Sequence, residues 1–348
     1  MAAAGSGVVD GILRMQELAD YIVPMAIRAV SDLRIADRLA AGPRPVEELA
    51  AETGTHAPAL RRVLRALACK GVFEEVEPGR FGLTPLAEPL RADHPLSLAG
   101  AYPLLPADLR AWARFDHTVR TGTSAFEHLF GQRYYDYLTE HPDESARFDA
   151  SVECQSRLVL RLLHTAYDWG SLGTIVDVGG GTGVFLAGLL ARHRRLRGVL
   201  LDLPHVVAGA PAVLERAGVA DRCEIVAGSF FDAVPAGADA YLLKTIVHDW
   251  RDADALALLR AVRSAMRADS RLLLLEALLA PGDAPEIGRL LDLHSLVLVE
   301  GPDRDADDLA RLLAAAGLEL ARVVPTSTLS ILEARPSPPD PRRGVRGG

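Results

Sequence analysis

Lysine is nearly absent from this chain of 348 residues. Only Lys70 and Lys244 occur, while acidic residues outnumber basic ones by 46 to 38, for a formal net charge of −8. No run of like charges marks a tail that would bind a polyanion, so the composition disfavours nucleic acid and anionic membrane surfaces as partners. The abundance of arginine, alanine and leucine hints at a bacterial, GC-rich genome.

Cysteines and long apolar runs are also scarce. Cys69, Cys154 and Cys223 lack the spacing of a zinc site or a disulfide framework, so we expect a cytoplasmic, reducing environment and no metal. Apolar runs such as 272–275 fall far short of the roughly 20 residues of a membrane span. The first residues lack the pattern of a signal peptide, so we expect neither a leader nor a membrane segment.

The apolar fraction of 49% is enough for a full core, and we expect four parts. They are a helical, winged-helix-like dimerisation domain (1–100), a helical linker and pocket region (101–168), a catalytic domain (169–335) and a disordered tail (336–348).

The N-terminal part begins with apolar residues at helical spacing over 10–39, which is typical of an amphipathic helix that needs a partner surface. Helices at 45–54 and 57–71 and short strands at 72–76 and 80–84 then follow the order of a winged helix. Residues 1–95 hold 11 Lys/Arg against 13 Asp/Glu, the wrong sign for binding DNA. We therefore expect a homodimer interface here.

Residues 105–168 are helical in pattern and rich in aromatics, among them Trp112 and Phe148, which suit either a pocket wall or plain core. After Trp169, short apolar strands alternate with helices. This alternation predicts an α/β fold with a Rossmann-like, doubly wound parallel sheet.

The segment 175–183 predicts a cofactor site, because a buried strand runs into a glycine loop and then a helix. A dinucleotide fingerprint would place its third glycine at Val184 or Leu186, so both frames fail and NAD is disfavoured.

What remains is an acid, Asp177, followed by Gly179, Gly181 and Gly183. This pattern suits a ligand with an ammonium and no pyrophosphate, as in S-adenosylmethionine. Asp202 ends the next strand, where a carboxylate binds a ribose diol, although it could instead cap a helix.

His248 follows the fourth strand-like run and precedes Asp249 and a helix, so we expect it at the carboxyl edge of the sheet. An imidazole with a reference pKa of about 6.5 can take the proton of an acceptor hydroxyl near neutral pH.

The stretches LLDLPHVV, VDVGGGTG and KTIVHDW resemble the S-adenosylmethionine-dependent O-methyltransferases that modify plant phenolics and bacterial polyketides. The resemblance covers nearly the whole chain. It implies an N-terminal dimerisation region, a Rossmann-like catalytic domain, bacterial secondary metabolism such as antibiotic biosynthesis, and a small aromatic acceptor.

The resemblance also implies roles for single residues. Lys244 would lie beside the cofactor, Phe230 would cover the adenine, and Ser229 stands where relatives use Asp to hold the adenine amino group. Glu276 and Asp303 would flank the base. The acceptor would contact Trp112, Phe148, Val152 (Met in many relatives), Asp249 and His294.

Three alternatives remain open. Relatives are known in which the bound cofactor supports hydroxylation or decarboxylation. A ligand-sensing winged-helix regulator and an NAD-dependent oxidoreductase are disfavoured by the acidic N-terminal part and by the glycine spacing.

Overall fold

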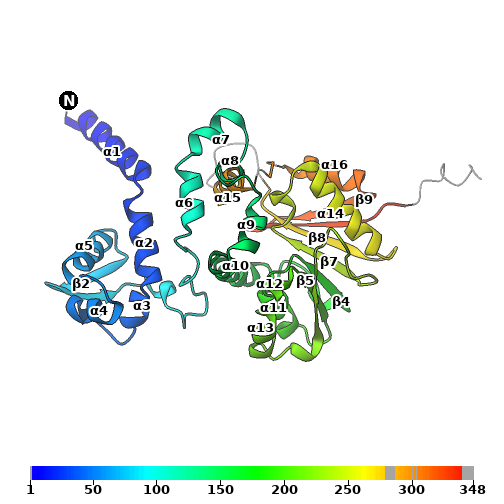
Figure 1. The fold of residues 1–348 in the computed structure, drawn as a ribbon, viewed down its shortest axis with the longest axis horizontal. Helices are drawn as coiled ribbons and strands as arrows, with labels where there is room; N and C mark the ends of the chain where they lie inside the picture. The colour runs from blue at the N-terminus through cyan, green and yellow to red at the C-terminus, as the bar shows by residue number, and fades with distance from the viewer. Residues whose placement is uncertain (1, 279–286, 300, 303, 339–348) are drawn as a thin grey trace, which may run out of the picture. The chain divides into compact units, whose positions relative to one another are not determined.

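The computed structural model describes residues 2–278, 287–299, 301–302 and 304–338. Its contacts divide the chain into two compact units, the first ending at Leu104 and the second beginning at Leu105 (Figure 1). Within the described residues no helix is long and apolar enough to cross a membrane.

The first unit combines helices with a small antiparallel sheet of strand order β1-β3-β2. Leu49, Leu64, Phe73 and Phe81 are buried in its core. The sequence of two helices and a hairpin confirms the winged-helix-like prediction. The elements are α1 (Ala2–Ala19), α2 (Ile22–Asp32), α3 (Ile35–Arg38), β1 (Arg44–Pro45), α4 (Val46–Thr53), α5 (Ala57–Ala68), β2 (Phe73–Glu77), β3 (Arg80–Leu83) and the 3₁₀ turn η1 (Glu88–Leu90).

The predicted N-terminal helix is interrupted after α1. The side chain of Asp20 accepts the backbone N–H of Ile22 at 2.8 Å, a local bond that competes with the helical pattern. Large apolar side chains of α1 are exposed in the single chain, including Ile12 (55%), Met15 (64%) and Leu18 (64%). Such a face needs a partner surface.

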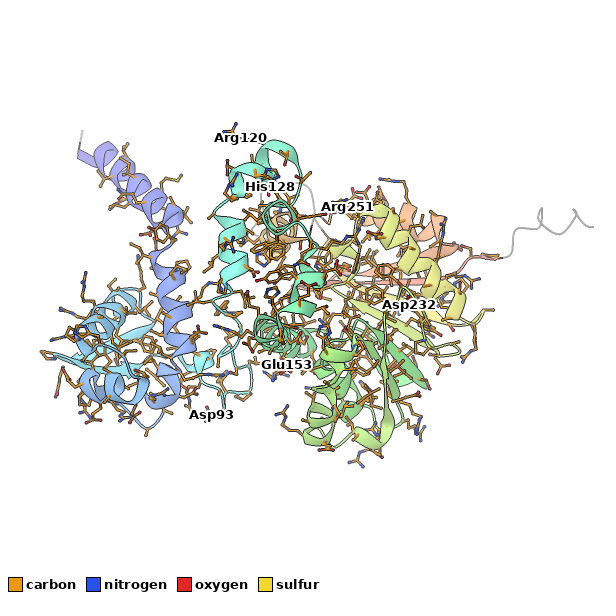
Figure 2. The ribbon with its side chains drawn as sticks, viewed as in Figure 1. Asp93, Arg120, His128, Glu153, Asp232 and Arg251 are labelled. Atoms are coloured by element: carbon orange, nitrogen blue, oxygen red, sulfur yellow. The ribbon has the colours of Figure 1, made fainter. Side chains whose placement is uncertain are left out.

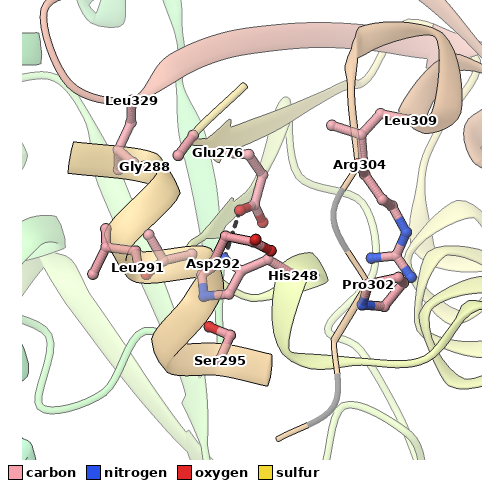
Figure 3. A pocket seen from close by; sticks show the side chains of 12 residues that line it. His248, Glu276, Gly288, Leu291, Asp292, Ser295, Pro302, Arg304, Leu309 and Leu329 are labelled. Atoms are coloured by element: carbon pink, nitrogen blue, oxygen red, sulfur yellow. Dashed lines mark hydrogen bonds and ion pairs between the residues drawn. The ribbon is translucent and has the colours of Figure 1, made fainter. Parts of the chain in front are cut away.

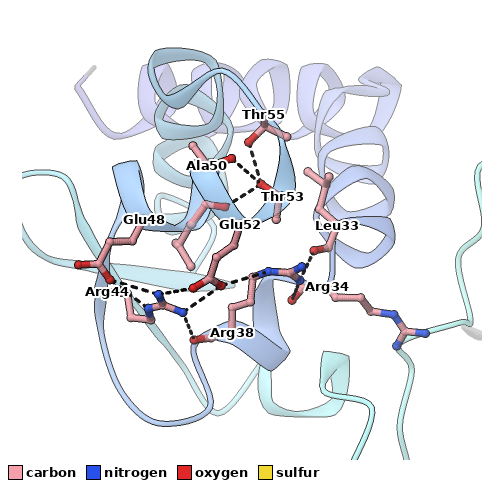
Figure 4. Close-up of polar contacts among 10 residues, drawn as sticks. Leu33, Arg34, Arg38, Arg44, Glu48, Ala50, Glu52, Thr53 and Thr55 are labelled. Carbon is pink, nitrogen blue, oxygen red and sulfur yellow. Dashed lines mark hydrogen bonds and ion pairs between the residues drawn. The ribbon is translucent and has the colours of Figure 1, made fainter.

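Polar contacts join β1 to the neighbouring helices α3 and α4 (Figure 4). The guanidinium of Arg44 lies 2.6 Å from Glu52 and 3.2 Å from Glu48, and Arg38 donates to the carbonyl of Leu33 at 2.6 Å. Exposed ion pairs of this kind add little stability singly, so they chiefly orient the strand.

The second unit places five helices before a large sheet. The helices are α6 (Pro106–Trp112), α7 (Phe115–Thr121), α8 (Ala125–Phe130), α9 (Tyr134–Glu140) and α10 (Pro142–Leu163), followed by the turn η2 (Trp169–Ser171). The sheet region holds β4 (Thr174–Val178), α11 (Val184–Arg192), β5 (Arg197–Asp202), α12 (Pro204–Val207), α13 (Ala210–Arg216), η3 (Ala220–Arg222), β6 (Cys223–Ala227), β7 (Ala240–Lys244), η4 (Val247–Asp249), α14 (Asp252–Ala265), β8 (Arg271–Glu276), α15 (Ile287–Leu298), α16 (Ala306–Ala315), β9 (Leu318–Val324) and β10 (Ser330–Pro336).

The seven strands run in the order β6-β5-β4-β7-β8-β10-β9. The first five are parallel, as predicted, and β10 pairs antiparallel with both β8 and β9, which adds an edge that the sequence analysis did not predict. Strand residues alternate between two cores: Ile175 faces α11, whereas Val176 and Val178 face α14. The fold class is therefore confirmed.

The sheet also has a topological switch point. The chain runs outward from β4 to β6 and then returns to place β7 on the other side of β4. Ligands of doubly wound folds bind at the carboxyl ends of the strands beside such a reversal. Gly179, Asp202, Lys244 and Glu276 all lie at these strand ends.

Candidate active site

The loop after β4 is built from glycines in left-handed conformations. Gly179, Gly181 and Gly183 have φ values of 71°, 64° and 81°, which other residues adopt only with strain. A Cβ on Gly179 would lie 2.7 Å from the side chain of Ile246, and one on Gly183 would lie 2.9 Å from Leu200, whereas one on Gly181 would meet nothing within 4 Å. Side chains therefore pack against the loop at Gly179 and Gly183, whereas Gly181 has open space beside it.

Asp202 at the end of β5 closes one side of this loop. Its Oδ2 accepts the backbone N–H of Gly181 and its Oδ1 that of Leu203, both at 2.7 Å. Burial raises the pKa of Asp202, whereas these two hydrogen bonds lower it. Helix α12 begins at Pro204 without a side-chain cap, so Asp202 binds the glycine loop rather than a helix end. Each oxygen keeps acceptor capacity for a diol.

Asp177 lies within β4 and is fully buried. Among the described residues neither carboxylate oxygen has a hydrogen-bond partner, and Gly180 lies directly against it, because a Cβ there would approach its Cγ at 2.6 Å. Burial raises its pKa to about 7. Burial lowers the pKa of Lys244, whereas the negative charges of Asp177 and Glu276 raise it. The ionisation of Lys244 therefore depends on these two carboxylates.

Ser229 and Phe230 lie beyond β6. The hydroxyl oxygen of Ser229 accepts the N–H of Phe231 at 3.2 Å. The Phe230 ring comes within 3.5 Å of the place where a Gly179 Cβ would stand, and it packs edge-on to Trp250 at 5.8 Å. A ring therefore borders the glycine loop, as expected of a residue that covers an adenine.

The glycine loop is also held from α10. Glu153 projects from α10 (labelled in Figure 2). Thr182 donates to it at 2.8 Å, and Arg157 pairs with the same carboxylate at 3.1 Å. The sequence analysis did not single out Glu153. The open glycine, the free acceptor capacity of Asp202 and the unpartnered Asp177 together fit a ligand that carries a diol and a cationic group, as S-adenosylmethionine does.

His248 lies in the short turn η4 between two carboxylates. Its Nδ1 is 2.7 Å from Oε2 of Glu276, and its Nε2 is 3.1 Å from Oδ1 of Asp249. The imidazole is 34% exposed, while the two carboxylate side chains are 4% and 10% exposed. Burial lowers the pKa of His248, but Asp249 and Glu276 outweigh burial and raise it well above its ordinary value.

Glu276 also holds the backbone of this turn, because its Oε1 accepts the N–H groups of Ile246 and Val247 at 3.2 and 2.9 Å. Thr245, two residues before η4, has a φ of 53°, an unusual conformation for a β-branched residue. Backbone strain of this kind is held in place by surrounding contacts and is common at functional sites.

Arg304 supports η4 from the other side. Its buried guanidinium donates to the carbonyl of Val247 at 2.8 Å and to that of Trp250 at 2.7 Å, and it pairs with Asp252 at the start of α14. The sequence analysis missed this residue, and no local pattern marks it. The neighbouring Asp303, predicted to flank the base, lies outside the described residues.

Aromatic side chains from α6, α9 and α10 surround this edge of the sheet. Tyr135 donates to Oδ2 of Asp249 at 2.5 Å, and its ring contacts Phe148 and Trp250. Farther along, Nε1 of Trp112 donates to Nδ1 of His294 at 3.2 Å with their rings stacked, and His294 is exposed. Val152 is half-buried on α10.

A pocket opens beside His248 (Figure 3). It encloses about 530 Å³, its open mouth included, and its lining includes Thr245, His248, Glu276, Leu291, Asp292 and Ser295. Among the described residues that line this pocket there is no predicted acceptor contact: Trp112, Phe148, Val152, Asp249 and His294 all lie outside the lining. Among the described residues no cluster of three or more His, Cys, Asp or Glu side chains could hold a metal.

Two family models match the chain. An O-methyltransferase domain matches residues 112–319, and an O-methyltransferase dimerisation domain matches residues 15–93. The second match includes the exposed apolar residues Met15 and Leu18, and it supports a homodimer.

Individual proteins align over nearly the whole length. The chain is 43% identical to the phenazine O-methyltransferase of Lysobacter antibioticus over 96% of this chain and 98% of that protein. It is 35% identical to the aclacinomycin 10-hydroxylase of Streptomyces purpurascens, covering 88% and 84%. A crystal structure of an O-methyltransferase from neocarzinostatin biosynthesis, with S-adenosylmethionine and 2-hydroxy-5-methyl naphthoic acid bound, superposes with a TM-score of 0.78 at 36% identity, covering 92% and 98%.

Proposed function

The chain belongs to the S-adenosylmethionine-dependent O-methyltransferase family, and from this premise we propose that His248 is the general base that activates a hydroxyl of a small aromatic acceptor. The observation that carries the proposal is the 2.7 Å contact between Nδ1 of His248 and Glu276 at the carboxyl edge of the sheet. This contact fixes the ring through Nδ1, so Nε2, which lies 3.1 Å from Asp249, is the nitrogen that would take the proton of the acceptor.

The cofactor-binding residues would be Gly179, Gly181 and Gly183 of the loop, with Asp202 on the ribose and Asp177 below. Ser229 and Phe230 would contact the adenine, and Lys244 would lie beside the cofactor. When bound, S-adenosylmethionine supplies an electrophilic methyl group on a sulfonium sulfur that leaves as a neutral thioether. The protein therefore needs no metal for the leaving group.

The protein also has to remove the proton from the hydroxyl of the acceptor. As the acceptor O–H bond breaks, its proton forms a bond with Nε2 of His248, and the electron pair stays on the oxygen. Glu276 holds Nδ1 and stabilises the imidazolium that results. A phenol, with a reference pKa near 10, loses its proton more readily to a base whose pKa is raised.

We propose an aromatic acceptor because relatives of this chain act on phenazine and naphthoate compounds, as their names state. The aromatic side chains Trp112 and Phe148, with Val152, would form one wall of its site, and Asp249 and His294 would supply polar contacts. Asp303 would flank the base as a second acid. We also propose a cytoplasmic location, since Cys69, Cys154 and Cys223 are all unpaired, which suits a reducing compartment.

The first experiment separates the cofactor from the reaction. Calorimetric titration with S-adenosylmethionine, and in parallel with NAD, should show saturable binding of S-adenosylmethionine alone. Transfer of a labelled methyl group to a panel of phenols would then show the reaction. Binding of NAD, or of neither compound, would contradict the assignment of the loop.

The second experiment tests the base. His248→Gln should bind S-adenosylmethionine as the wild type does and lose about 100- to 10,000-fold in methyl transfer. His164→Gln is the matched control, because His164 lies at the end of α10 and its Nδ1 contacts the carbonyl of Arg161 at 2.9 Å. Unchanged turnover in His248→Gln would overturn the proposal.

A second candidate reaction is favoured by one observation, the similarity to a hydroxylase. Mass spectrometry of the acceptor product distinguishes the two reactions directly. Methyl transfer adds a CH₂ unit to the acceptor, whereas hydroxylation adds one oxygen atom.

A further inference from the structure

Asp249 connects the candidate base to a tyrosine of a distant helix. Its Oδ1 lies 3.1 Å from Nε2 of His248, and its Oδ2 accepts the hydroxyl hydrogen of Tyr135 at 2.5 Å. Tyr135 belongs to α9 and is 114 residues away in the sequence. Each oxygen of one carboxylate is thus bonded to a different side chain.

This arrangement occupies both nitrogens of the ring. Glu276 holds Nδ1 and Asp249 holds Nε2, so a neighbouring carboxylate favours a proton at each position. A base must be neutral, with a free nitrogen, before it can take a proton from an acceptor. Asp249 therefore has to leave Nε2 before the acceptor hydroxyl can use it.

We propose that Tyr135 is a positioning residue that holds Asp249 by Oδ2 and thereby weakens its hold on Nε2 of His248, so that the acceptor hydroxyl can replace it. The proposal rests on the proposed role of His248 as the base. When the carboxylate of Asp249 breaks its contact with the imidazole of His248, it still has its short hydrogen bond to Tyr135. A carboxylate without that bond would have only the imidazolium to neutralise it.

The surroundings of Tyr135 suit this role. Its ring stacks on Trp250 at 6.1 Å with an interplanar angle of 21°, and it packs edge-on to Phe148 at 6.2 Å. Burial, followed by Asp249, raises the pKa of Tyr135 well above its ordinary value, so the hydroxyl keeps its proton and acts as the donor. Aromatic packing thus fixes the ring, and removal of the hydroxyl alone leaves these contacts in place.

Several other charged groups face the same region. They are Glu276 on β8, Lys244 on β7, Asp292 on α15 and Arg304 before α16. Tyr135→Phe alters none of these side chains, since its hydroxyl bonds Asp249. A change in the titration of His248 in this variant is therefore transmitted through Asp249.

The test measures the titration of His248 in the full-length protein without an acceptor. Histidine labelled with ¹³C at Cε1 is followed by NMR across a pH series, and the His248 signal is assigned by its loss in His248→Gln. In Tyr135→Phe we expect the pKa of His248 to shift upward from its wild-type value. In Asp249→Asn we expect it to shift downward, because a negative charge is removed.

Tyr134→Phe is the matched control. It removes the hydroxyl of the neighbouring tyrosine, which donates to Oδ2 of Asp108 at 3.5 Å. We expect its His248 signal to titrate as in the wild type. An unchanged or lowered His248 pKa in Tyr135→Phe would overturn the inference. This measurement needs no turnover. It therefore distinguishes a failure of this proposal from a failure of His248 as the base, which methyl transfer by His248→Gln reports.

Discussion

Glu276 Oε2 lies 2.7 Å from Nδ1 of His248, while Oε1 of the same carboxylate accepts the backbone N–H groups of Ile246 and Val247. One residue at the end of β8 therefore orients both the imidazole and the turn that carries it. Such a carboxylate fixes the ring tautomer and favours the protonated ring that forms during proton transfer.

Glu276→Gln tests this coupling by removing the charge while keeping a group of similar shape. The pKa of His248 should fall, because one of the two carboxylates that raise it is gone. The acidic limb of kcat/KM should then move to lower pH, since the ring loses its proton earlier. The maximum rate should fall by about tenfold or more, as each 1.4 kcal/mol of lost transition-state stabilisation is tenfold.

The measurement for Glu276→Gln is a pH–rate profile with a phenolic acceptor found in the panel. Calorimetry with S-adenosylmethionine provides the control, because Glu276 is not among the expected cofactor contacts. An acidic limb at the wild-type position would show that Glu276 does not tune the base.

Asp177 predicts a pH dependence of stability. Its folded pKa is raised to about 7 from an ordinary value near 3.8, so the folded state binds its proton more tightly than the unfolded state. The resulting stabilisation is complete below about pH 4 and is lost as the pH rises toward 7. An asparagine at position 177 cannot ionise, so the variant does not lose stability in this way as the pH rises.

The difference in Tm between Asp177→Asn and the wild type should therefore depend on pH. Relative to the wild type, Asp177→Asn should gain stability between pH 5 and pH 8, whatever its difference at pH 5. A difference in Tm that stays constant over this range would contradict a raised Asp177 pKa. Calorimetry on the same samples reports whether the substitution also weakens cofactor binding.

Ser229 is expected to limit cofactor affinity. Hydrogen bonds to a charged acceptor contribute about 1.5–3 kcal/mol, against about 0.5–1.5 kcal/mol for neutral ones. Ser229→Asp should therefore lower the Kd for S-adenosylmethionine by about fivefold, while Ser229→Ala should raise it. Calorimetric titration measures both, and an aspartate variant that binds no tighter would remove Ser229 from the adenine site.

The sequence predicted the parts of this site that local pattern determines. The glycine loop is defined by a buried strand, glycine spacing and a following helix, and the positions of Asp202, Lys244 and Glu276 follow from where each parallel strand ends. These features depend on residues close together in the chain. The assignment of the family rested on the same stretches.

Contacts between distant segments could not be predicted in this way. Tyr135 reaches Asp249 across 114 residues, and Arg304 reaches Val247 across 57. An arginine or a tyrosine has no local signature that tells which carbonyl or carboxylate it will meet. The antiparallel strands β9 and β10 were missed in the sequence analysis, although their pairing completes the sheet beside β8.

Arg304 supplies the last prediction. Its guanidinium donates to the carbonyls of Val247 and Trp250 on either side of His248, and only 8% of the residue is exposed. In Arg304→Met the carbonyl of Trp250 loses the guanidinium as its donor, and that of Val247 keeps only the backbone N–H of Trp250 at 3.3 Å. A buried group left unsatisfied costs about 1–3 kcal/mol. The free energy of urea unfolding should fall on the order of 3 kcal/mol, and methyl transfer should fall with it because η4 is no longer held.

Two further variants separate support of the turn from general instability. Arg304→Lys keeps the charge but lacks the planar fork that reaches both carbonyls, so it should recover only part of the loss. Arg311→Met removes an exposed arginine of α16 whose side chain is 71% exposed, and it should change stability by less than about 0.5 kcal/mol. If Arg304→Met kept full methyl transfer while losing stability, its contacts would serve the fold alone, because the base would be held in place without them.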